Sequence, residues 1–398
     1  MTTHTRRAGT LLLAVAGLLS LAAAMGIGRF AFTPMLPLML REDVLDVAQG
    51  GWLAAANYAG YLAGALTASR LPLRPGALTI AALLATAALT AAMALPLPLL
   101  WLSLRFLAGA TSAWVFVATS VWCLGALAGR GATWASGWVY AGVGVGIALT
   151  GTHCLVASAA GVRSQPLWLQ LGGLALMLAL PVWWVIARRE TVGAGTPPVG
   201  RRDVAAGHGN RGVVVCYGVM GFGYILPATF LPVLARGVVD DPRLFGLAWP
   251  LFGATAALST LLGAGLMRGA TRLRTWAACQ LLMGVGVLLP ALRQDAGTIA
   301  ASALLVGGTF MVITLAGVQE MRARAATPAR AASLVGSVTA AFACGQIAGP
   351  VVSALLLRLG AGGLLLALAI GAASLFATVP WLWRASSSPS LLEELPNG

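Results

Sequence analysis

Twelve apolar runs, each long enough to cross a lipid bilayer, restrict the fold of this chain more than any other feature. A transmembrane helix needs about 20 mostly apolar residues, and a backbone in hydrocarbon must satisfy its own hydrogen bonds. We therefore predict an all-α integral membrane protein with twelve transmembrane helices. The runs lie at roughly 8–38, 48–69, 76–95, 98–124, 132–157, 166–187, 212–235, 243–266, 275–292, 297–318, 333–357 and 361–383.

One polar stretch, residues 187 to 212, divides these runs into two sets of six. Elsewhere the connections are short, and only 9% of the 398 residues are charged, too few to cover a soluble protein of this size. We predict an N-terminal six-helix bundle at 1–187, a cytoplasmic linker at 188–211 and a C-terminal six-helix bundle at 212–398.

A net charge of +14 would suggest a nucleic-acid partner if the chain were soluble, but the distribution of the charge indicates a membrane protein. All 25 basic residues are arginines, and with an even number of spans most of them fall on the side that holds both termini. This positive-inside bias predicts cytoplasmic termini and no nucleic-acid partner. The first run also has the basic start and small-residue end of a signal peptide, but its apolar character continues to Leu40, which favours an uncleaved helix.

The two halves of the chain repeat each other. With an offset of 195 residues, "MGIGRFAFTPMLPLML" in the first run aligns with "MGFGYILPATFLPVLA" in the seventh, and "LAGATS" at 107–112 aligns with "LVGGTF" at 305–310 at a similar offset. Because each half holds six spans, both repeats have the same orientation in the membrane. Parallel repeats of this kind are typical of the two halves of major facilitator transporters.

Several motifs resemble those of that superfamily. "RFLAGATSA" at 105–113 is similar to its fourth-helix signature, and "YAGVGVGIALTG" at 140–151 has the glycine ladder of its antiporter signature without the proline. "GALTASRLPLR" at 64–74 resembles the loop between helices two and three, with Ala68 in place of the usual Asp.

More narrowly, "GIGRFAFTPMLPLM", "GWLAAANYAGYLAGAL" and "AFACGQIAGP" resemble the uncharacterised YbfB/YjiJ-type branch of the major facilitator superfamily. The resemblance implies the major facilitator fold and a monomeric secondary transporter for a small molecule in the bacterial cytoplasmic (inner) membrane. It supplies no substrate.

Two arginines lie inside spans. At about 1.5 Å per residue, Arg29 lies about 13 Å inward from Leu38, and Arg105 about 10 Å inward from Pro98. A charge at this depth is costly and normally faces a watery cavity or a partner. We predict that Arg29 and Arg105 bind an anion, since guanidinium matches a carboxylate bidentately. The alternative is that they snorkel outward or brace helix ends.

Other polar residues in the spans are candidates for the lining of the same cavity. Each of the tyrosines could equally be a hydrogen-bonded link between helices, whereas the glycines of the ladder, such as Gly142 and Gly146, indicate close helix packing. Prolines in the first and seventh runs, at 34, 37, 227 and 232, predict kinks or broken turns in both. The predicted substrate-binding set is Arg29, Arg105, Asn57, Tyr61, Tyr140, Tyr224 and Gln346.

His153 is the one intramembrane group that titrates near neutral pH, and it is the candidate for proton coupling. A structural role is the alternative. None of the eleven acidic residues lies in the middle of a span, so coupling could also run through a protonatable substrate or an exchanged anion, or be absent.

Three functions remain open after the sequence. The first is alternating-access transport of a small organic carboxylate, and the second is efflux of amphiphilic drugs, which the glycine ladder and 13 tryptophans favour. The third, a membrane-embedded enzyme or sensor, lacks support because the chain has no catalytic motif of the hydrolase, metalloprotease or P-loop type. The cysteines fall within spans and the histidines are scattered, so we predict no cofactor and no metal.

Overall fold

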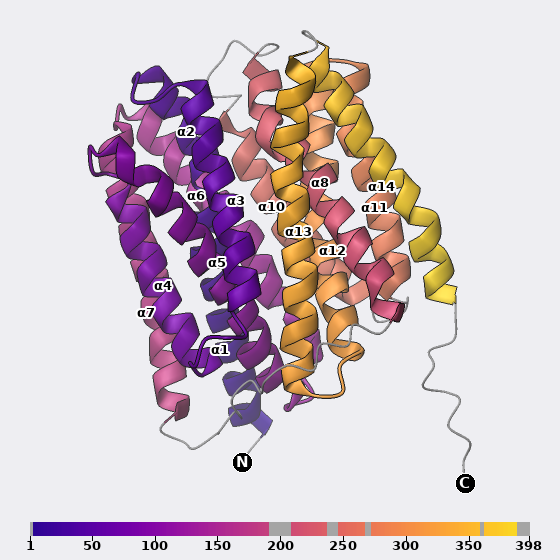
Figure 1. Ribbon diagram of the computed structural model, residues 1–398. Coiled ribbons are helices and arrows are strands. Elements are labelled where there is room, and N and C mark those ends of the chain that lie inside the picture. The colour runs from indigo at the N-terminus through magenta and orange to yellow at the C-terminus, as the bar shows by residue number, and fades with distance from the viewer. Residues whose placement is uncertain (1–2, 191–207, 237–245, 267–271, 359–361, 388–398) are drawn as a thin grey trace.

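The computed structural model describes residues 3–190, 208–236, 246–266, 272–358 and 362–387, and over these residues it is a bundle of helices without strands (Figure 1). The helices are α1 (Thr3–Leu21), η1 (Ala22–Arg29), α2 (Phe32–Arg41), α3 (Val47–Thr67), α4 (Pro75–Ala92), α5 (Pro98–Ala128), η2 (Thr133–Ala135), α6 (Ser136–Ala159), α7 (Ser164–Glu190), α8 (His208–Arg236), α10 (Ala248–Leu266), α11 (Arg272–Leu292), α12 (Ala296–Ala323), α13 (Pro328–Leu357) and α14 (Gly363–Ser387).

These elements make twelve membrane-length spans in the described part of the chain, because α1, η1 and α2 together form the first. Ten spans are long and apolar enough to cross a membrane. The other two, α3 and α10, have 21 and 19 residues, which at about 1.5 Å per residue also approaches the ~30 Å of a bilayer core. The start of α1 and the end of α14 lie at the same end of the bundle, here called the termini end (Figure 1). Most of the predicted linker at 188–211 lies outside the described residues.

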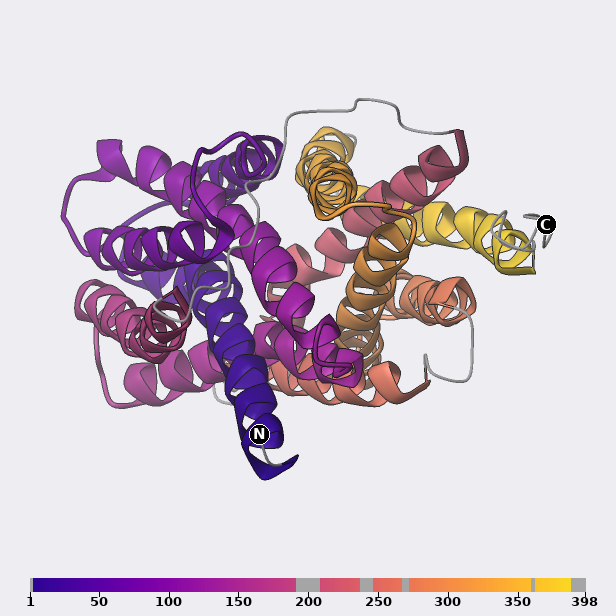
Figure 2. The same ribbon diagram turned by 90° about the horizontal axis from the view of Figure 1, so that it is seen from below.

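The two halves pack their helices in the same pattern, as the sequence repeat requires. The first span packs on α6 as α8 packs on α13, α3 packs on α5 as α10 packs on α12, and α4 packs on α7 as α11 packs on α14. Figure 2 shows the halves side by side when the molecule is viewed from below. They meet where α6 contacts α10 and where α3 contacts α13. The predicted architecture of two parallel six-helix repeats is confirmed.

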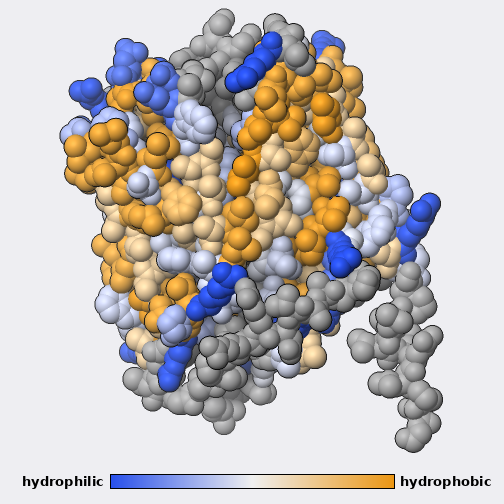
Figure 3. All heavy atoms as spheres, viewed as in Figure 1, coloured by the Kyte–Doolittle hydropathy of each residue, from blue (hydrophilic) through white to orange (hydrophobic). Residues whose placement is uncertain are grey.

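The outer surface is suited to lipid. Large apolar side chains such as Leu99, Leu262 and Leu292 are more than two-thirds exposed, an arrangement that water would not tolerate over so wide an area. Figure 3 shows apolar residues over the middle of one face and hydrophilic residues mainly toward its two ends. The protein is therefore a multi-pass membrane protein.

Glycines let α6 approach two neighbours at once. A β-carbon on Gly146 would lie 2.7 Å from the Ala22 Cα in the first span, and one on Gly144 would lie 2.6 Å from the Gly253 carbonyl oxygen in α10. Gly142 meets α1 in the same way as Gly146. The glycine ladder thus permits close packing within the N-terminal half on one face and between the halves on the other, which confirms the packing interpretation.

We expect Gly146→Ala to lower the melting temperature of the detergent-purified protein by several degrees, because the new methyl group overlaps backbone atoms of the first span and overpacking costs about 1–3 kcal/mol. Gly173→Ala in α7 is the control, since no atom lies within 4 Å of its β-carbon position. That control should leave stability unchanged or slightly raised. Equal melting temperatures for the two variants would contradict this account of the packing.

Candidate functional site

The first span is interrupted at its centre, and the interruption follows from Pro34. Proline has no N–H to donate to the Phe30 carbonyl four residues earlier. The N–H of Thr33 reaches that carbonyl instead, at 3.2 Å, and so turns away from the Arg29 carbonyl. Before this point η1 is a π-helix, in which the Phe30 N–H donates to the Met25 carbonyl at 3.0 Å. Backbone carbonyls at the end of η1 are therefore left for other partners.

Arg105 of α5 takes up these carbonyls. It donates from Nη1 to the Gly28 carbonyl at 3.3 Å and from Nη2 to the Arg29 carbonyl at 3.1 Å. Ser112, also of α5, donates to the Ala24 carbonyl earlier in η1 at 2.8 Å. Arg105 is 3% exposed, and its guanidinium carbon lies 4.9 Å from the centre of the Phe32 ring. Arg105 thus braces the break in the first span.

Arg29 occupies a different environment, although it lies at a similar depth. The residue is 2% exposed, its Nη2 donates to Oε1 of Gln346 in α13, and its guanidinium carbon lies 3.6 Å from the centre of the Tyr61 ring. Phe30, Tyr58 and Phe342 surround it at 5.4 to 5.8 Å. The contact with Gln346 joins the two halves of the protein.

The charge of Arg29 is not balanced by a carboxylate in the part of the chain that the structure describes. Ion pairs among the described residues include Arg272–Glu320, Arg293–Asp295 and Arg324–Glu320, all away from the centre of the spans. Nε and Nη1 of Arg29 have no hydrogen-bond partner among the described residues. Cation–π contacts are worth about 2 kcal/mol when desolvated, less than the several kcal/mol that burial of an ion costs. The site therefore presents an uncompensated buried cation.

Three of the predicted site residues form one group. Arg29 contacts both Tyr61 and Gln346, whereas Asn57 donates from Nδ2 to the Arg105 carbonyl at 3.0 Å. Asn57 and Gln346 are both fully buried. Arg105 belongs to this region, but its two terminal nitrogens bond backbone carbonyls.

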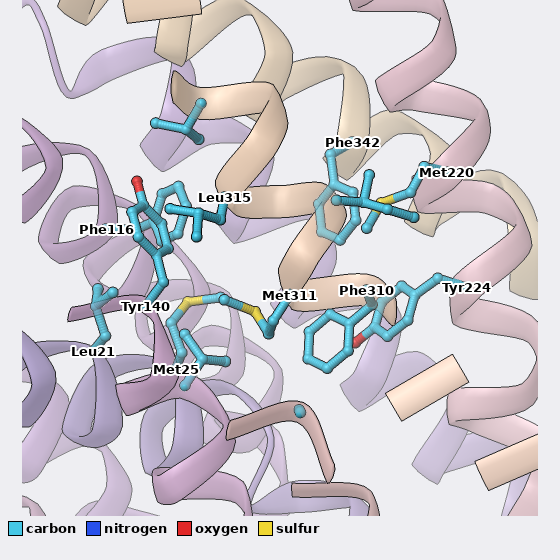
Figure 4. Packing of buried hydrophobic residues seen from close by; sticks show 14 of the residues in the cluster. Leu21, Met25, Phe116, Tyr140, Met220, Tyr224, Phe310, Met311, Leu315 and Phe342 are labelled. Carbon is cyan, nitrogen blue, oxygen red and sulfur yellow. The ribbon is translucent and has the colours of Figure 1, made fainter. Parts of the chain in front are cut away.

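The two predicted tyrosines outside this group lie apart from each other. Tyr224 of α8 stacks on Phe310 and Phe342, with ring centres 5.0 and 5.7 Å away, and its hydroxyl has no partner among the described residues. Tyr140 of α6 pairs its hydroxyl with the Ser120 hydroxyl at 2.9 Å. Figure 4 shows them on opposite sides of Met311, with Tyr140 against Phe116.

His153 is not brought to this group. Its Nε2 lies 2.9 Å from Oε1 of Gln170, so the ring links α6 to α7 within the N-terminal half, and the side chain is partly exposed. The structure gives it a partner outside the Arg29 environment.

Sequence reasoning identified Tyr61 but missed Phe30 and Phe342 beside Arg29 and Trp249 behind Phe30. Phe342 precedes Gln346 by four residues, so both must lie on one face of α13, and this spacing was available in the sequence. Trp249 had no such signal, because it reaches the site by packing on Phe30 across the boundary between the halves, with ring centres 6.3 Å apart.

The seventh span does not share the break of the first. The counterpart of Pro34 at the offset of 195 is Thr229, which keeps its N–H, and α8 runs as one helix from His208 to Arg236 despite Pro227 and Pro232. Of the kink or broken turn predicted for both spans, the broken turn is therefore absent from the seventh, in which residues 208–236 form one continuous helix. At the same offset Arg29 corresponds to Tyr224, so equivalent positions in the two halves hold a cation and an aromatic hydroxyl.

The two buried arginines should respond in opposite ways when their charge is removed. Arg105→Gln leaves carbonyls of the first span without a donor, and unsatisfied buried groups cost about 1–3 kcal/mol each, so this variant should melt at a lower temperature. Arg29→Gln removes an uncompensated buried charge, so its stability should be equal or higher without ligand. Thermal unfolding in detergent checks both. A loss in Arg29→Gln as large as that in Arg105→Gln would show that both arginines brace the fold.

Comparison with known proteins agrees with the fold and places the chain in a family. Residues 21–380 match the family described as "Uncharacterised MFS-type transporter YbfB". Among solved structures, the human organic anion transporter MFSD10 (TETRAN) has a similar fold, with a TM-score of 0.68 and 15% identity over 96% of this chain and 100% of that one. No curated protein matches. With its two parallel six-helix repeats and a family match over most of its length, the chain belongs to the YbfB-type family of major facilitator superfamily transporters.

Proposed function

We propose that this protein is a secondary active transporter that moves a small organic anion of the carboxylate type by alternating access, with Arg29 as its anchor. The proposal rests on the buried guanidinium of Arg29, which has two unpartnered nitrogens and no ion pair among the described residues. An anion would supply the missing charge and hydrogen bonds. The human protein with a similar fold is an organic anion transporter, which agrees with the proposed substrate charge.

The planar guanidinium suggests how the anion would enter. A carboxylate binds it bidentately either through Nη1 and Nη2 or through Nε and Nη2. Nη2 carries two N–H groups, and Gln346 accepts from one of them. A carboxylate would therefore take the second N–H of Nη2 together with the unpartnered Nη1 or Nε. The anion and Gln346 of α13 would then share one guanidinium, which places the bound anion at the contact between the two halves.

Alternating access requires contacts between the halves that can open. At the termini end, Arg322 of α12 donates to the Ser120 carbonyl of α5, and Gln319 donates to the Ser136 hydroxyl of α6 at 2.8 Å. These are single hydrogen bonds to neutral oxygens, while α6 and α10 meet through glycines. Such a boundary supports rocking of one half against the other, with the termini end closed in the present conformation.

The remaining assignments complete the proposal. The arginine distribution supports both termini in the cytoplasm, and the repeat supports bundles at 1–187 and 212–398. The YbfB-type family supports a bacterial cytoplasmic membrane and a monomer. Transport, and not catalysis, accounts for the buried cation. Asn57, Tyr61, Tyr224 and Gln346 would shape the site, with Arg105 holding the backbone of Arg29 in place.

Coupling through His153 is the least supported part of the predicted mechanism, because the imidazole bonds to Gln170 and not to the Arg29 group. We expect His153→Gln, assayed in proteoliposomes, to retain the pH profile of wild-type benzoate uptake. Coupling would then run through an exchanged anion or through protonation of the substrate after its release from Arg29, or be absent. Loss of the pH dependence in this variant would instead assign coupling to His153.

The anion assignment is tested by thermal stabilisation of the detergent-purified protein with small carboxylates, phosphorylated metabolites and lipophilic cations. A ligand that binds only the folded state raises its melting temperature by mass action. We expect carboxylates such as benzoate to stabilise the wild type and to lose this effect in Arg29→Ala. Arg293→Ala, which removes an exposed arginine paired with Asp295, is the matched control and should respond like the wild type.

Stabilisation by lipophilic cations alone, unchanged in Arg29→Ala, would contradict the anion proposal. It would then favour efflux of amphiphilic drugs as the function.

A further inference from the structure

A continuous row of stacked aromatic rings lies beside Arg29, and every ring in it comes from the C-terminal half. The row runs from Trp249 to Phe252, Phe310, Tyr224 and Phe342, and we call it the aromatic wall. Its neighbouring ring centres are 5.0 to 5.7 Å apart, with interplanar angles of 5° to 23°. Figure 4 shows Tyr224 reaching from its helix to lie against Phe310, with Phe342 nearby.

Both ends of the aromatic wall lie near Arg29. Phe342 lies 5.8 Å from the guanidinium carbon, and Trp249 packs on Phe30, whose ring lies 5.4 Å from that carbon. The cation is therefore contributed by one half and the aromatic wall by the other. The sequence repeat leads to the same arrangement, since Tyr224 is the counterpart of Arg29 and equivalent positions face a shared centre.

The aromatic wall also contains polar groups without partners. The Tyr224 hydroxyl and the Trp249 Nε1 have no hydrogen-bond partner among the described residues, and neither has Nε2 of Gln346 beside Arg29. All three side chains are more than nine-tenths buried. Buried donors without acceptors are costly, and a purely structural aromatic cluster would be built from phenylalanine. These groups match acceptor atoms of a ligand.

We propose that the substrate is a small aromatic carboxylate, whose carboxylate group binds Arg29 and whose ring packs against the aromatic wall, edge to face or offset. The inference rests on the proposed function and specifies its substrate class. Phe342 contacts both Arg29 and Tyr224, so the ring and the carboxylate must be joined directly or by a short spacer. Because the two groups bind to different halves, such a substrate draws the halves together when it is bound.

The test compares two monoanions with the same number of carbon atoms, benzoate and cyclohexanecarboxylate, in equilibrium binding to the purified wild-type protein. Labelled benzoate is the probe, and the unlabelled acids compete with it. Aromatic stacking adds to the burial that both acids share, so benzoate should bind about two- to tenfold more tightly. This comparison uses only the wild-type protein, so its result does not depend on whether a variant folds.

Single-residue variants then test which rings cause the preference for benzoate. Phe310→Leu should abolish the advantage of benzoate while cyclohexanecarboxylate still binds, and Tyr224→Phe, which keeps the ring, should retain it. Phe116→Leu is the matched control, because Phe116 is an equally buried aromatic residue that pairs with Tyr140 in the other half. It should leave the preference unchanged.

The outcomes separate this inference from the proposed function. Equal affinities for the two acids, both lost in Arg29→Ala, would overturn the aromatic substrate class and leave the anion transporter intact. A benzoate preference that survives Phe310→Leu would remove the aromatic wall as its cause. Absence of Arg29-dependent binding for either acid would overturn both.

Discussion

A permanently charged guanidinium held at the centre of a membrane protein, without a carboxylate in contact among the described residues, is the constraint from which the rest of this site follows. Ion burial costs several kcal/mol, and the Gln346 amide and the Tyr61 ring return only part of this. A protein that needed only stability would hold an apolar residue at this position. A buried arginine at this position is explained if an anionic substrate neutralises its charge during part of the transport cycle.

The surrounding structure holds that charge in position. Pro34 interrupts the first span, the interruption frees backbone carbonyls, and Arg105 takes up two of them. Glycines at 142 and 146 bring α6 close enough for Thr150 to donate to the Gly26 carbonyl at 3.3 Å. The backbone that carries Arg29 is thus fixed from two sides, while its side chain reaches across to α13. An anchor that is fixed in one half and contacts the other half suits an alternating-access site.

The two repeats share a fold and differ in chemistry. Their helices pack in the same pairs, yet the position held by Arg29 in one half is held by Tyr224 in the other, and the proline that interrupts the first span is a threonine in the seventh. The symmetry brings the two positions to a common centre. The asymmetry makes one side of that centre cationic and the other aromatic. A molecule bound between them would therefore have a defined orientation.

The spans, their number and the repeat could all be predicted from the sequence, because hydrocarbon allows few backbone structures and the length of an apolar run fixes a helix. Arg29, Tyr61, Asn57 and Gln346 could be identified as well, since polar residues in lipid are rare enough to notice. Arg29 and Arg105, however, look alike along the chain. Their difference emerges only when the helices pack, because Arg105 then bonds nearby carbonyls while Arg29 meets Gln346, 317 residues away.

The aromatic wall likewise depends on the packed helices. Its rings come from α8, α10, α12 and α13, and their stacking requires distant segments to lie together. The spans are set by the length and polarity of local runs, which any stretch of sequence displays. The site is set by which side chains face each other across helices, and an apolar ring carries no local sign of the neighbour it will meet.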